Sequence, residues 1–175
     1  MRQLKGFIFV LTGLAIMVTL FSLLIPSNVM TVRSVVIHGD TGFVISEIRD
    51  LKKWKDWHPV FMNDSSKVII SDPSAGVNAF ATWNTNGNAN KFVITESSSN
   101  HIQASLMRKG ENDVTNIISV NAVSDSTAIQ VEWRVLTILK WYPWEKFYGI
   151  VIEKFSGPGY EAALNNLKNL AEKTR

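Results

Sequence analysis

Few side chains in this chain combine the type and the spacing that chemistry needs. His58 stands between Trp57 and Pro59, and Asp56 precedes it by two positions. On a strand this spacing would aim both side chains at one metal ion, but the segment is predicted to be a helix end, and two ligands do not make a site. We therefore predict a capping or surface role for His58, no metal site and no cofactor.

Two carboxylates lie in segments whose alternation is typical of strands. Glu132 points away from its neighbour Trp133 and is predicted to face solvent. Glu96 shares a face with Phe92 and Ile94 and is predicted to face inward, where burial would raise its pKa. The sequence has no nucleophile-elbow, phosphate-loop, dinucleotide-binding or zinc-protease motif. No catalytic residue is predicted.

Aromatic side chains are the main functional signal, because the chain has six tryptophans. Core packing alone would account for any one of them, since aromatic residues dominate core energetics. As a set they favour an apolar pocket with few polar groups, the usual form of a small-molecule site. The predicted cavity residues are Trp54, Trp57, Phe61, Trp83, Glu96, Trp133, Trp141, Trp144, Phe147, Val151 and Phe155.

The cluster Trp141-Tyr142-Pro143-Trp144 has a second interpretation. Tryptophan and tyrosine favour the headgroup depth of a membrane, so the cluster is also predicted as an interfacial belt. A pocket mouth and a membrane contact do not exclude each other.

The N-terminal segment sets the organisation of the chain. The run from Phe7 to Ile25 has no charged residue over 19 positions, which nearly matches a hydrocarbon core of about 30 Å. A cleaved signal peptide would have a shorter apolar stretch of about 7–15 residues and an A-x-A-like site. We predict a retained transmembrane anchor over residues 1–26 and one domain over residues 27–175.

The charges around this segment indicate its orientation. Arg2 and Lys5 precede the span and Arg33 follows it, which favours a cytoplasmic N-terminus and a domain outside the cytoplasm, tethered to the cell membrane by a single pass. After the anchor the chain carries 16 basic and 15 acidic side chains, which excludes the electrostatic footprint of a nucleic-acid-binding protein. Without cysteine it has no disulfide framework.

Hydrophobic periodicity predicts the elements of the domain. A β-branched run predicts a first strand over Val29–Ile37, followed by a helix capped by Asp40 or Thr41 and ending at Arg49, and by a second short helix over Leu51–Trp57 that Pro59 stops. Alternating segments separated by turn residues then predict six strands over Lys67–Ser71, Ala79–Thr85, Lys91–Glu96, Ile102–Met107, Val114–Val123 and Ala128–Leu136.

Helical spacing returns at the C-terminus. Tyr160, Leu164 and Leu167 belong to an apolar stripe, so a long helix is predicted to pack on the sheet. Gly157-Pro158-Gly159 is predicted to kink or briefly break that helix. The fold class is α+β, a curved antiparallel sheet of about seven strands wrapped on a long C-terminal helix, with two short helices after the first strand and one transmembrane helix before it.

Four segments carry a resemblance to a known family through their order along the chain. The first two are the strand Arg33-Ser34-Val35-Val36-Ile37 and the segment from Ile48 to Pro59, which has two tryptophans three positions apart. The other two are the turn from Ser74 to Ala79, followed by Trp83, and Gly157-Pro158-Gly159-Tyr160 in the last helix. Together they resemble the START-like, helix-grip superfamily, in the SRPBCC or polyketide cyclase/dehydrase-like branch. Asn78 departs from that pattern, which usually has a second glycine in the turn.

The resemblance implies a cavity between sheet and long helix, on a scaffold shared by binders, transporters and enzymes. Our leading hypothesis is a membrane-tethered binder of a lipid or other hydrophobic small molecule. The alternatives are a cyclase or dehydratase that uses polar groups inside the cavity, such as Glu96 or His58, and a non-catalytic module that binds a protein partner through an exposed face.

Overall fold

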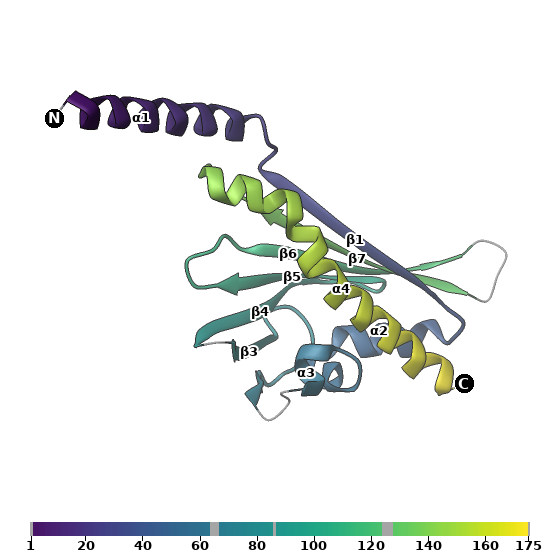
Figure 1. Cartoon of the computed structure of the whole chain (residues 1–175). Helices are drawn as coiled ribbons and strands as arrows, with labels where there is room; N and C mark the ends of the chain where they lie inside the picture. Colours follow the sequence, from purple (N-terminus) through teal and green to yellow (C-terminus); the bar gives the residue numbers. More distant parts are fainter. Residues whose placement is uncertain (1, 64–66, 86, 124–127, 175) are drawn as a thin grey trace.

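The computed structural model describes residues 2–63, 67–85, 87–123 and 128–174. Within these residues, seven strands form one antiparallel sheet in the order β1-β7-β6-β5-β4-β3-β2, and the long helix α4 crosses it (Figure 1). The strands are β1 (Asn28–Ile37), β2 (Ile69–Ile70), β3 (Phe80–Thr85), β4 (Asn88–Ser97), β5 (His101–Arg108), β6 (Val114–Ala122) and β7 (Ile129–Ile138). The helices are α1 (Arg2–Leu23), α2 (Thr41–Arg49), the 3₁₀ helix η1 (Leu51–Asp56), α3 (Pro59–Asn63) and α4 (Pro143–Lys173). This is the predicted α+β helix-grip arrangement.

The sheet faces α4 with one set of alternating side chains. On β7, Ile129, Val131 and Trp133 are buried, whereas Glu132 pairs with Arg134 on the other face at 2.9 Å. The predicted alternation of this strand is therefore confirmed. The first strand of the chain pairs with the last. Strand β1 lies antiparallel to β7, from Asn28 opposite Ile138 to Ile37 opposite Ile129.

The short helices after β1 begin at the predicted places. Asp40 caps α2, because its Oδ2 accepts a hydrogen bond from the Phe43 N–H at 2.8 Å. Pro59 does more than stop the preceding helix, since it is the first residue of α3, where proline needs no N–H partner. Asn78 adopts φ of 70° in the turn before β3, a left-handed conformation that asparagine tolerates in place of glycine. The predicted turns at Asn86 and Ser124–Ser126 lie outside the described residues.

Two elements differ from the sequence prediction. Strand β2 is only two residues long, against the five predicted over Lys67–Ser71. Helix α4 does not break at Gly157-Pro158-Gly159, because helical geometry continues through Pro158 to Lys173. Glycine has a different use in α4: a Cβ at Gly149 would overlap the side chain of Leu139, and a Cβ at Gly157 would overlap the Arg33 guanidinium. These two positions let the helix approach β1 closely.

Helix α1 is long and apolar enough over Gln3–Leu23 to cross a membrane, and most of its large side chains are exposed. The segment after α1 is fastened to α4 by the buried side chain of Lys146. Its Nζ donates hydrogen bonds to the Ile25 carbonyl at 2.9 Å and to Ser27 Oγ at 2.6 Å. The Leu139 N–H also donates to the Ser27 carbonyl, at 2.7 Å. Hydrogen bonds thus fix the four residues that join α1 to β1 against the rest of the domain.

Replacing Lys146 should loosen this junction. In Lys146→Met the Ile25 carbonyl loses a charged donor, which costs about 1.5–3 kcal/mol locally. We expect hydrogen exchange at the Leu24, Ile25 and Leu139 amides to accelerate about tenfold or more, as such a loss implies. Mass spectrometry of the full chain in micelles measures this. Lys154→Met, at an exposed position of the same helix, should exchange like the wild type. Equal rates in the two variants would contradict the fastening role.

Candidate functional site

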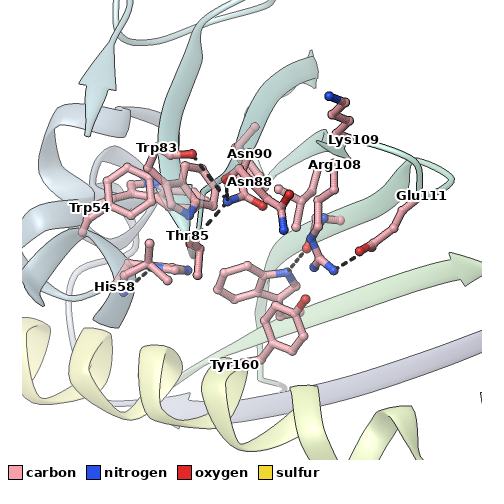
Figure 2. Close-up of a pocket in the computed structure, with 16 residues that line it drawn as sticks. Trp54, His58, Trp83, Thr85, Asn88, Asn90, Arg108, Lys109, Glu111 and Tyr160 are labelled. Carbon is pink, nitrogen blue, oxygen red and sulfur yellow. Dashed lines mark hydrogen bonds and ion pairs between the residues drawn. The ribbon is translucent and has the colours of Figure 1, made fainter. Parts of the chain in front are cut away.

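A cavity of about 430 Å³ lies between the inner face of the sheet, the η1–α3 segment and α4 (Figure 2). Inward-facing positions of five consecutive strands contribute to it, together with both short helical segments and one residue of α4. The lining residues are Trp54, His58, Val60, Phe61, Trp83, Thr85, Asn88, Asn90, Phe92, Leu106, Arg108, Lys109, Glu111, Asn116, Trp133 and Tyr160.

One wall of the cavity is aromatic. The ring of Trp54 lies 5.4 Å from Phe61 and 6.0 Å from Trp133, and Trp133 in turn lies 5.0 Å from Tyr160. Both indole N–H groups are already used, because Trp54 Nε1 donates to the Ile48 carbonyl at 2.9 Å and Trp133 Nε1 donates to Asn116 Oδ1 at 3.1 Å. The tryptophans therefore offer apolar ring surface to the cavity.

The cavity also has polar lining groups from β3, β4 and β6. The side-chain amide of Asn116 already has hydrogen-bond partners in the protein. Its Oδ1 accepts a hydrogen bond from Trp133 Nε1, and its Nδ2 donates to the Val114 carbonyl at 3.0 Å. Asn90 Nδ2 donates to Thr85 Oγ1 and to the Asn88 carbonyl, each at 3.3 Å. No side chain or backbone group in the described part of the chain donates to Asn90 Oδ1. Asn90 is only 7% exposed as a residue and lines the cavity, so this oxygen is an acceptor open to the cavity.

His58 lies in the aromatic wall, stacked on Trp54 at 5.2 Å between ring centres. Burial lowers its pKa to about 4, so the ring is neutral near pH 7. Its Nδ1 accepts a hydrogen bond from the Val60 N–H at 3.3 Å, which places the proton of the neutral ring on Nε2. The predicted capping role is confirmed, because this bond caps α3. The side chain also lines the cavity, which the sequence did not indicate, and Asp56 is exposed.

Three residues separate this cavity from a second one. Arg108 pairs with Glu111 at 2.9 Å, and Tyr160 stands next to them in Figure 2. Burial raises the pKa of the Tyr160 hydroxyl, and the charge of Arg108 opposes part of that rise. The same three residues line a cavity of about 390 Å³ under the first half of α4, where Trp144, Tyr148 and Ile152 form its helix side. The two cavities adjoin along this partition.

The structure brings four of the residues predicted from the sequence to the first cavity, namely Trp54, Phe61, Trp83 and Trp133. Trp57 is fully buried behind them, with its indole 5.0 Å from Trp54.

The remaining predicted residues lie on α4 or just before it, and they do not all face the same way. Trp144 lines the second cavity, one turn before Tyr148 and two before Ile152. Phe147 and Phe155 point outward and are 44% and 73% exposed. Val151 is half-buried and does not line either cavity, and Trp141, before the helix, is 63% exposed.

The prediction that Glu96 faces inward is wrong. A β-bulge at Thr95 shifts the register of β4, so Ile94 lies opposite Ala104 but Glu96 lies opposite Gln103. Because one extra residue reverses the alternation, Glu96 turns to the outer face, where its carboxylate contacts His101 Nε2 at 3.0 Å.

Sequence reasoning missed the polar lining residues Asn90, Asn116 and Arg108. Their signal was present: Asn90 is two positions before Phe92, and Asn116 is two positions before Ile118, each on the buried face of its strand. A polar residue at an inward position of a strand is the pattern that finds them.

No family model matches this sequence, and a search of curated proteins found no match. Solved structures do share its fold. A protein from Nitrosospira multiformis matches with a TM-score of 0.62 and 16% identity over 83% of this chain and 99% of its own. A START superfamily protein from Mycobacterium smegmatis matches with a TM-score of 0.60 and 11% identity over 84% of this chain and 99% of its own.

DynU16, a protein in the dynemicin biosynthetic locus, matches with a TM-score of 0.59 and 9% identity over 83% of this chain and 48% of its own. At such identities these matches concern the fold alone. The chain has the START-like, helix-grip fold that its sequence resembles.

The pKa of His58 predicts how stability depends on pH. In the unfolded chain His58 binds a proton below its ordinary pKa of 6.5, whereas in the folded chain it binds that proton only near pH 4. The folded state therefore loses stability as pH falls from about 6.5 to about 4. The loss from this group is at most about 3 kcal/mol. We expect the drop in Tm between about pH 7 and about pH 4.5 to shrink in His58→Phe, since phenylalanine does not titrate. Calorimetry of the full chain in micelles measures it.

His101→Phe is the matched control, because His101 lies on the outer face of the sheet beside Glu96. It should not shrink the drop in Tm. A His58→Phe variant with the full pH dependence would show that His58 is not held neutral by the fold.

Proposed function

We propose that this START-like domain is held at a membrane by α1 and binds a lipid or another hydrophobic small molecule between the sheet and α4. The observation that carries the proposal is the open cavity of about 430 Å³ walled by Trp54, Phe61, Trp83 and Trp133. Its volume lies within the range of about 300–1,000 Å³ that small-molecule sites occupy. Side chains do not fill the space that the helix-grip fold encloses.

The polar groups of the cavity specify one end of the ligand. Asn90 Oδ1 is a free acceptor, and His58 Nε2 carries a proton that it can donate. The nearby charges of Arg108 and Glu111 are paired with each other at 2.9 Å, and Lys109 is exposed to solvent and extends away from the other labelled residues in Figure 2. An apolar ligand with an uncharged polar end, such as an alcohol, an amide or a protonated acid, fits this combination best.

Helix α1 supports the membrane part of the proposal. Its side chains Phe7, Phe9 and Leu20 are 64%, 80% and 61% exposed, which is unfavourable in water and favourable in lipid. We propose a retained single span with the domain outside the cytoplasm, since Arg2 and Lys5 lie before the span. Protease added to intact cells should digest residues 27–175; a domain digested only after lysis would reverse the orientation.

A cyclase or dehydratase activity would have to use His58 or Tyr160 among the uncharged lining groups, because Glu96 lies on the outer face of the sheet and the lining carboxylate Glu111 is paired with Arg108 at 2.9 Å. Burial lowers the pKa of His58 to about 4 and raises that of Tyr160, so both groups are neutral near pH 7. Neutral groups with shifts in these directions are poor acid–base catalysts and good hydrogen-bond partners. Binding is therefore the function that the cavity supports best.

Filling the cavity should abolish binding. Thr85→Trp places an indole at the lining of the cavity, whereas Thr115→Trp makes the same change on the outer face of β6. The test is to reconstitute the full chain in nanodiscs that contain a diazirine-bearing fatty acid and to map the photo-crosslinked peptides by mass spectrometry. We expect crosslinks to β3, β4 and α3 to fall about tenfold in Thr85→Trp, which corresponds to a loss of about 1.4 kcal/mol.

Thr115→Trp should keep the crosslinks of the wild type. Crosslinks to the cavity that survive Thr85→Trp, or that fall equally in both variants, would count against this cavity as the binding site.

A further inference from the structure

The two halves of α4 have different surfaces. In the first half and just before it, Trp141, Trp144, Phe147, Ile150 and Phe155 are 63%, 68%, 44%, 64% and 73% exposed. We call these five residues the aromatic face. In the second half the exposed positions are polar or small, namely Glu161, Ala162, Asn165, Asn169 and Lys173. One helix thus changes from an apolar to a polar surface near its midpoint.

The aromatic face lies beside the place where α1 joins the domain. Helix α1 contacts α4, and Figure 1 shows the first half of α4 next to the C-terminal end of α1. On the α1 side, Ser22 is fully buried and Val18 is half-buried. Lys146, which lies between Trp144 and Phe147 in sequence, holds the residues that follow α1. The position of the aromatic face relative to α1 is therefore fixed by contacts.

The ionisable groups of this half-helix already have partners or reach water. Glu145 accepts from the Lys140 N–H at 2.7 Å, and Glu153 pairs with Arg33 at 2.9 Å. Lys154 is exposed and has an aliphatic stem long enough to place its ammonium in the headgroup region. The charges do not oppose contact of the aromatic face with lipid.

We propose that the aromatic face lies in the interfacial layer of the membrane that α1 crosses, with the first half of α4 beside the end of α1 that joins the domain. The proposal rests on the retention of α1 in the membrane, which is part of the proposed function. Tryptophan is enriched at membrane interfaces because its ring is apolar and its N–H is polar, and large exposed apolar patches mark such contacts.

This placement gives the second cavity a lipid-side entrance. Trp144, with Tyr148 and Ile152, forms the helix side of that cavity, and Trp144 is also part of the aromatic face. A ligand dissolved in the bilayer would enter between α4 and the sheet and reach the partition formed by Arg108, Glu111 and Tyr160. It would not have to cross water.

The absence of cysteine from the chain makes a direct test simple. Ile150→Cys and Phe155→Cys place a single bimane label on the aromatic face, and Asn165→Cys places the same label on the polar half of α4. Each full chain is reconstituted in phosphatidylcholine–phosphatidylglycerol vesicles with or without headgroup-level spin-labelled lipid. We expect quenching at positions 150 and 155 to be several times stronger than at position 165.

Quenching at positions 150 and 155 that equals the quenching at position 165 would overturn the proposal. Oxidative crosslinking of two Ile150→Cys chains without lipid quenching would also overturn it and would assign the face to a second copy of this chain. Flotation after a carbonate wash is read on the same vesicles. If the chain is washed off the vesicles, α1 is not a membrane anchor, and the proposed function is contradicted together with this proposal. If the chain floats with the vesicles but its label is not quenched, only the placement of the aromatic face is contradicted.

Discussion

The structure depends on how α4 is supported over the sheet. Its second half is packed conventionally, with Ala163, Leu164, Leu167 and Ala171 buried in the core. Its first half has little apolar burial and is held instead by close approach at Gly149 and by the hydrogen bonds of Lys146. A helix that is firmly packed at one end and pinned at the other spans the space between, and the second cavity lies under that span. The first cavity adjoins it at Tyr160, the one α4 residue in its lining.

The tryptophans serve the core and the cavity together. Trp54 and Trp133 are each only 1% exposed, yet their rings line the cavity, and the polar atom of each indole is satisfied by a hydrogen bond, to the Ile48 carbonyl and to Asn116 Oδ1 respectively. Such a wall stays rigid, since each indole is held by its N–H hydrogen bond and by contacts with neighbouring aromatic rings. A cavity with rigid walls remains open in the absence of a ligand, which lowers the conformational cost of binding.

Much of this arrangement followed from the sequence, and the exceptions have physical reasons. Period-two alternation placed Trp133 on the inner face of β7 correctly, because that strand is regular. The same rule failed for Glu96, since a single bulge residue reverses the faces beyond it and leaves no mark in hydrophobicity. On α4, composition identified an apolar segment but not its rotation, so Phe147 and Phe155 were grouped with Trp144 although only Trp144 lines a cavity. That rotation is set by Gly149 and Gly157, which approach Val29 and Arg33 on β1, far away in the sequence.

The four residues between α1 and β1 span at most about 14 Å even when fully extended. On the proposed anchoring, the domain cannot diffuse away from the bilayer, and its cavities sample a thin layer of solution next to the lipid. Occupancy is then governed by the local concentration of the ligand in that layer and not by its concentration in the surrounding volume. A site of modest intrinsic affinity would be filled under such confinement, although the same site would stay largely empty if the domain were free in solution.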